Sequence, residues 1–248
     1  MSDITTLVLV TVAALSASLT AGVAGPLADA LARRHPIVIP PPARWVALAV
    51  RSPQRAGVAG LVGALVAWRW EAEPLAAVVV LAALGVAGVA AMVDRRCHRL
   101  PDLLVAPLGL GLVVVAGGWS LVSGEPRWLV AAGVAGAAAG GVLILGWAAG
   151  MGFGDVKFGA ALGLGLGWSV GSPTVAVFAG LGLVGLAAAG ASVWWGWRRT
   201  VGGCAPRWFP FGPFLAAAAL VGLLLLGPPG DPGGLWVEPV RPGVPGHR

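Results

Sequence analysis

Eight long apolar runs dominate this sequence and restrict what the chain can fold into. A helix that crosses a bilayer needs about 20 predominantly apolar residues, because in lipid each backbone N–H and C=O has to be bonded within the segment. Two of the runs are shorter, and a 15-residue helix reaches only about 22 Å at 1.5 Å per residue. The sequence therefore predicts an all-α, polytopic membrane protein with about eight transmembrane helices, at 4–25, 56–70, 74–93, 103–122, 127–148, 156–170, 173–197 and 212–227.

The composition supports a membrane protein and excludes other classes. Only 10% of the residues are charged and 58% are hydrophobic, whereas soluble domains carry about 25% charged residues. The 12 tryptophans fall mostly near the ends of apolar runs, where an indole can keep its N–H among lipid headgroups. The basic pI does not indicate a nucleic-acid partner, because no basic patch is interleaved with exposed aromatic residues. The expected surroundings are the lipid bilayer.

Basic residues collect on one side of the predicted bundle. Loops after the first, third, fifth and seventh runs hold twelve of the 16 lysines and arginines. Cytoplasmic loops carry such an excess, so these loops are predicted to be cytoplasmic and both termini to lie outside. The leading residues of the first run, MSDITT, contain no Lys or Arg, so this run is predicted to be a retained span rather than a cleaved signal peptide.

A single membrane-embedded domain is expected over residues 1–227. It includes a short cytoplasmic loop at about 26–55 and a core with the sequence motifs at about 74–227. Residues 228–248 are rich in proline and glycine and are predicted to be a disordered tail.

Two aspartates on the predicted cytoplasmic side are the candidate catalytic residues. Asp94 ends the apolar run LAALGVAGVAAMV, and Asp155 lies in the stretch MGFGDVKFG at the start of the sixth run. Charged groups at membrane depth are costly and usually functional. Two carboxyl groups at one depth can share a single proton, because like charges held close together cannot both ionise. One can then accept a proton from water while the other polarises a scissile carbonyl.

The ends of the predicted helices suggest a role for each aspartate. Asp155 opens a helix, whose N-terminus favours a carboxylate, and Asp94 closes one, whose C-terminus favours the neutral acid. On this argument Asp155 is the base and Asp94 the acid. The nearby cations Arg95, Arg96 and Lys157 weaken the distinction.

Four further residues are candidates for a supporting role. Gly152 and Gly154 lack a Cβ, so a substrate strand could lie against the backbone beside Asp155. Asp102 follows a proline and precedes an apolar run, so helix N-capping and a supporting site role are both open to it. Lys157 could orient the carboxylates or bind the substrate, or it could be an interfacial anchor.

Three stretches together resemble the prepilin peptidases, membrane aspartic proteases of the G-x-G-D type that process type IV pilin precursors. They are VDRRCHRLPD at 93–102, GMGFGDVKFGAALGLGLG at 150–167 and FPFGPFLAAAAL at 209–220. The resemblance implies that Asp94 and Asp155 are the catalytic pair. It also implies cleavage of a short basic leader from pilin-like precursors at the cytoplasmic face of the inner membrane, without a metal or other cofactor. The P-F-G-P stretch is expected to shape the start of the last helix rather than to take part in chemistry.

One departure from the family concerns the first cytoplasmic loop. Many bacterial members have a large loop there with two C-x-x-C pairs that bind zinc, and they also methylate the new N-terminus. In this chain the only cysteines are Cys97 and Cys204, so that loop has no thiolate ligands for zinc. The resemblance therefore implies a minimal peptidase, and we do not expect N-methyltransferase activity.

The main alternative is a transporter or channel that uses Asp94 and Asp155 as a proton or cation relay. A relay needs acidic groups near the bilayer midplane or on both sides, whereas both aspartates are predicted at one face. No inverted repeat of the transporter kind is visible either. The sequence therefore favours the peptidase, and it does not indicate an oligomeric state.

Overall fold

The computed structural model describes residues 53–97, 100, 102–200 and 210–228. Within these ranges the chain forms helices and no strands, which confirms the all-α prediction for this part of the chain. The first predicted span, most of the loop at 26–55, the tail from 229 and both termini lie outside the described residues. The helices are α3 (Pro53–Arg69), α4 (Pro74–Cys97), α5 (Asp102–Ser123), α6 (Arg127–Ala148), α7 (Phe153–Val170), α8 (Pro173–Thr200) and α9 (Gly212–Leu226).

Four of these helices are long and apolar enough to cross a membrane. They are α4, α5, α6 and α8, with mean hydropathies between 1.9 and 2.6 over the spanning segments. Helices α3 and α9 are also apolar but contain fewer than 18 residues. The described part of the chain is thus compatible with a membrane protein, and the total of eight spans stays a prediction.

The helix ends differ from the predicted spans where the acids lie. Helix α7 begins at Phe153, three residues before the predicted start at 156, so Asp155 lies inside its first turn. Helix α4 continues beyond the predicted end at 93 to Cys97, so Asp94 lies inside its last turn. Both differences have one cause. An apolar run is bounded by the nearest charged residue, whereas the hydrogen bonds of the helix continue past that residue.

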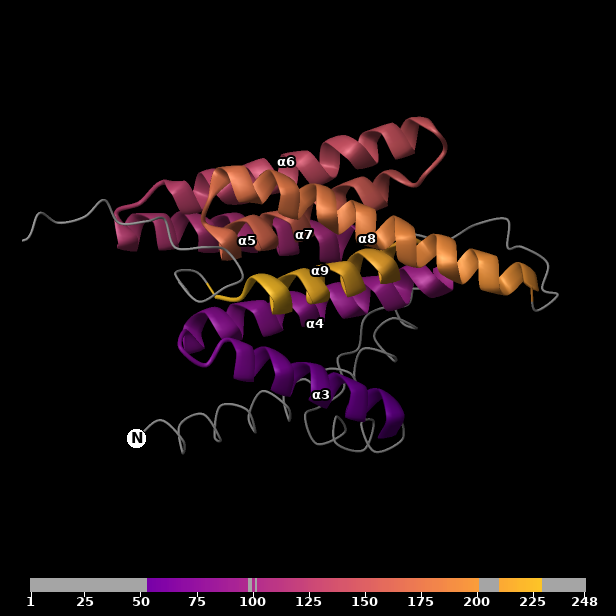
Figure 1. Ribbon diagram of the computed structural model, residues 1–248, viewed down its shortest axis with the longest axis horizontal. Coiled ribbons are helices and arrows are strands. Elements are labelled where there is room, and N and C mark those ends of the chain that lie inside the picture. Colours follow the sequence, from indigo (N-terminus) through magenta and orange to yellow (C-terminus); the bar gives the residue numbers. More distant parts are fainter. Residues whose placement is uncertain (1–52, 98–99, 101, 201–209, 229–248) are drawn as a thin grey trace, which may run out of the picture.

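Helix α7 is the centre of the fold. The helices run roughly along the long axis of the molecule, and α9 lies between α4 and α8 (Figure 1). Helix α7 contacts α5, α6, α8 and α9, while α3 lies at the margin against α4 and α9. Most of the residues of α7 are buried, including Asp155, Phe158 and Trp168. A helix covered in this way can carry a polar group that would be costly against lipid.

Small residues allow α6 and α7 to pack with their backbones close together. Gly159, Gly163 and Gly167 recur every four residues along α7 and so lie on one face. A Cβ added at Gly163 would lie 2.7 Å from the carbonyl oxygen of Ala135 in α6, and one added at Gly167 would overlap the carbonyl group of Ala131. Such small-residue faces are typical of helix pairs in membranes, where close backbone approach gives dispersion contacts.

The tryptophans only partly match the predicted positions among headgroups. Trp68 and Trp147 are exposed, in agreement with that expectation, whereas Trp70 and Trp168 are fully buried. The rings of Trp70 and Trp168 lie 6.1 Å apart, and Trp119 meets Trp168 edge-on at 5.9 Å. Nearness to the end of an apolar run does not give the direction in which a side chain points from its helix, so the headgroup prediction was wrong for Trp70 and Trp168.

Candidate active site

Asp94 is buried near the C-terminal end of α4, with 5% of its surface exposed. Its Oδ2 atom accepts a hydrogen bond of 2.9 Å from the backbone N–H of Gly212, the first residue of α9. The first N–H groups of a helix have no partner within the helix, so this carboxyl group satisfies one of them. A Cβ at position 212 would lie 2.9 Å from the same oxygen, and glycine therefore permits the approach.

Asp155 is buried in the first turn of α7, with 8% of its surface exposed. Its backbone N–H bonds to the carbonyl oxygen of Gly152, which closes this first turn. Its Oδ1 atom is buried and has no hydrogen-bond partner among the described residues. A buried carboxyl oxygen left unbonded is unfavourable, and such groups in a fold are frequent at functional sites.

The fold brings the two candidate catalytic aspartates together. The carboxyl groups of Asp94 and Asp155 lie within range of a direct electrostatic repulsion. They come from α4 and α7, which are separated in sequence by α5 and α6. Apart from two serines, they are the only buried polar or charged residues in the part of the chain whose burial is described. Two carboxyl groups held this close can share one proton and act as an acid and a base.

The two glycines before Asp155 have structural roles that differ from each other. Gly152 is the N-cap residue of α7, and its φ of −66° does not require glycine; a Cβ there would come within 3.3 Å of Oδ2 of Asp155. A Cβ at Gly154 would lie 2.9 Å from the Cβ of Leu100. Gly154 thus lets α7 approach the connection between α4 and α5. A positive φ occurs just before these residues, at Gly150, where φ is 101°.

Asp102 and Lys157 form an ion pair with each other. Lys157 Nζ donates to both carboxylate oxygens of Asp102, at 2.8 and 3.0 Å. Asp102 is the first residue of α5, and its carboxylate joins this helix to the first turns of α7. The ion pair directs Lys157 Nζ to Asp102, while substrate binding and interfacial anchoring by Lys157 stay predictions.

The Asp102–Lys157 pair is expected to contribute little to stability. Its side chains are 68% and 41% exposed, and exposed pairs contribute about 0–1 kcal/mol. We expect Lys157→Met to lower the free energy of unfolding by less than about 1 kcal/mol, measured by thermal unfolding in detergent. The reversed pair, Asp102→Lys with Lys157→Asp, should restore part of the loss. A loss of several kcal/mol would show that this exposed pair carries more of the fold than its geometry indicates.

The sequence did not identify Gly212 as part of the site. The P-F-G-P stretch was expected only to shape the start of the last helix, and the structure does place a helix start there. It also directs the N–H of Gly212 at Asp94, across 118 residues of sequence. The only signal in the sequence was a glycine directly before a proline at a helix start, which does not indicate which side chain the N–H will meet.

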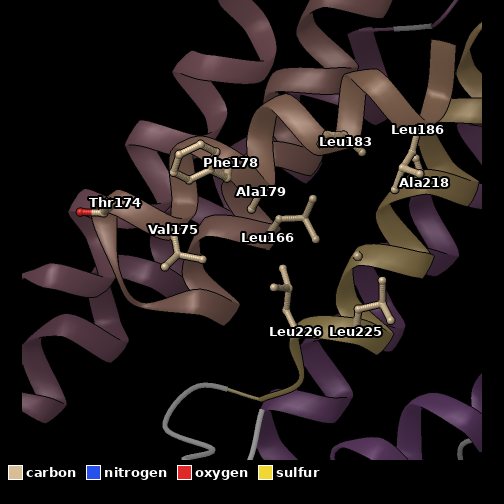
Figure 2. A pocket seen from close by; sticks show the side chains of 12 residues that line it. Leu166, Thr174, Val175, Phe178, Ala179, Leu183, Leu186, Ala218, Leu225 and Leu226 are labelled. Carbon is tan, nitrogen blue, oxygen red and sulfur yellow. The ribbon is translucent and has the colours of Figure 1, made fainter. Parts of the chain in front are cut away.

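One apolar cavity lies away from the aspartates. It has a volume of about 390 Å³ and is lined by residues of α7, α8 and α9, among them Leu166, Phe178 and Leu225 (Figure 2). Thr174 is the one lining residue with a side-chain oxygen. The cavity lies beside the C-terminal half of α9, whereas Gly212 begins that helix. With no ionisable lining residue, it cannot supply acid–base chemistry.

Comparisons with known proteins add no identification. No protein-family description, curated protein or solved structure matched the chain. The likeness to prepilin peptidases therefore depends on the three sequence stretches.

Proposed function

We propose that this protein is a membrane aspartic endopeptidase that removes the short basic leader from type IV prepilin-like precursors. The observation that carries the proposal is the meeting of two buried carboxyl groups, Asp94 and Asp155, within electrostatic range of each other. Aspartic proteases use two carboxyl groups that share one proton. The three stretches that resemble the family also supply the three parts of this site: Asp94, Asp155 and the N–H of Gly212.

The chemistry proposed for this pair is direct addition of water to the peptide carbonyl. The ionised carboxyl group takes a proton from water as the water oxygen bonds to the carbonyl carbon, and the protonated one donates to the carbonyl oxygen. As the C–N bond of the tetrahedral intermediate breaks, the first carboxyl group gives its newly gained proton to the leaving amine, and the second takes back a proton from a hydroxyl group of the intermediate. One shared proton is enough for this cycle, because each carboxyl group ends in the state in which it began.

The proposed substrate fits a membrane enzyme with its acids at one end of a helix bundle. The apolar helix of a precursor can stay in lipid while its basic leader extends into the aqueous phase. We place the aspartates at the cytoplasmic face of the inner membrane, since the loops on their side carry most of the Lys and Arg residues. Products of such cleavage would serve a type IV pilus, a secretion system or DNA uptake.

The test of the function is the processing of a precursor. We expect co-expression of the full chain with a pilin-like precursor from the same genome to give a product shortened by its leader, detected by mass spectrometry of the N-terminus. A product of unchanged mass with every such precursor of that genome would contradict the proposal. Proton or cation flux into vesicles that contain the purified chain, with no processing, would favour the relay instead.

A further inference from the structure

We propose that the backbone N–H of Gly212 holds Asp94 as the ionised member of the pair, so that the shared proton belongs to Asp155. This reverses the roles expected from the ends of α4 and α7 alone. The catalytic meaning of the assignment depends on the proposed peptidase function, while the location of the proton does not.

The surroundings of Asp94 favour a negative charge. Its Oδ2 accepts from Gly212 N–H at 2.9 Å, and an N–H that points at a carboxyl oxygen stabilises the ionised form. This N–H belongs to the first turn of α9, a helix of 15 residues, whose N-terminus carries partial positive charge. The C-terminal end of α4, which disfavours a charge on Asp94, is therefore opposed by the N-terminal end of α9.

The surroundings of Asp155 favour the neutral acid. Its Oδ1 is buried and without a hydrogen-bond partner among the described residues, and burial without a partner penalises the charged form. Asp155 does lie at the N-terminus of α7, which favours a charge. However, a direct hydrogen bond to a charged group stabilises it more than the helix macrodipole alone, so Asp94 is the better site for the charge.

Nearby cations do not alter this assignment within the described residues. Lys157, two residues after Asp155, has its Nζ bound by both oxygens of Asp102. Arg95 follows Asp94 directly and has an exposed side chain. The like charge of Asp94 itself acts on Asp155 and disfavours its ionisation. In the proposed cleavage Asp94 is then the base that takes a proton from water, and Asp155 is the acid that binds the carbonyl oxygen.

Infrared spectroscopy of the purified full chain tests where the proton lies without any need for activity. Neutral carboxyl groups have a C=O stretching band separate from that of carboxylates. We expect this band at neutral pH in the wild type, and its loss in Asp155→Asn. A wild type without the band, or persistence of the band in Asp155→Asn, would overturn the assignment. Absence of precursor processing by the wild type would instead count against the peptidase function only.

A second experiment removes the N–H of Gly212 without adding an atom to the side chain. Incorporation of glycolate at position 212 replaces the Phe211–Gly212 amide with an ester and deletes this donor. We expect kcat to fall by about tenfold or more, KM to stay within about twofold, and the acid limb of the pH–rate profile to move to higher pH. An ester at Phe214, whose N–H bonds to the Phe211 carbonyl oxygen, is the matched control and should leave the acid limb in place. An unmoved acid limb with the ester at 212 would overturn the role of this N–H.

Discussion

Asp94→Asn and Asp155→Asn are each expected to reduce processing of a pilin-like precursor by at least about a hundredfold. Asparagine has nearly the same shape as aspartate but cannot exchange a proton, and general acid–base groups contribute about 10²–10⁴ in rate. Both positions are buried, and each substitution also removes a repulsion between the two carboxyl groups. The folded protein should therefore persist while turnover is lost. The measurement is the fraction of precursor cleaved with time, by purified enzyme in detergent or liposomes.

The control for these variants is Glu71→Gln, which also replaces a carboxylate with an amide. Glu71 is exposed in the turn between α3 and α4, at the opposite end of α4 from Asp94. Its processing rate should equal that of the wild type. If both aspartate variants cleaved the precursor at the wild-type rate, the aspartic mechanism would be contradicted.

Gly163→Ala is expected to destabilise the protein, by about 1–3 kcal/mol or more, through the contact between α6 and α7. Its new Cβ would lie 2.7 Å from the Ala135 carbonyl oxygen and 3.0 Å from the Gly136 Cα. Both are backbone atoms, so relief requires one helix to move away from the other. Because α7 carries Asp155 in its first turn, such a movement should also lower processing. The measurement is the midpoint of thermal unfolding in detergent.

Gly133→Ala in α6 makes the same chemical change as Gly163→Ala, but we do not expect it to lower the midpoint of thermal unfolding. A Cβ at this exposed position meets nothing within 4 Å, and alanine has a higher helix propensity than glycine. The midpoint should therefore stay the same or rise. If both substitutions shifted it equally, the close packing of α6 on α7 would not be what stabilises the bundle.

The helices themselves could be predicted from the sequence because their signals are local. Long apolar runs predicted every helix in the described residues, and the span at 127–148 coincides with α6. The errors were at helix ends and in helix rotation: α7 starts earlier than its apolar run, and Trp70 and Trp168 point into the core.

The sequence alone therefore predicted the helices of the described residues, four of which are long and apolar enough to cross a membrane, and it identified Asp94 and Asp155 as the candidate catalytic acids. Only the tertiary structure decided what surrounds each acid. The Gly212 N–H reaches Asp94 across 118 residues, and Lys157 reaches Asp102 across 55. The physical reason is that hydropathy and helix propensity act over a few neighbouring residues. Which helix end meets which side chain depends instead on how closely α4, α7 and α9 can pack, and therefore on glycines far away in the sequence.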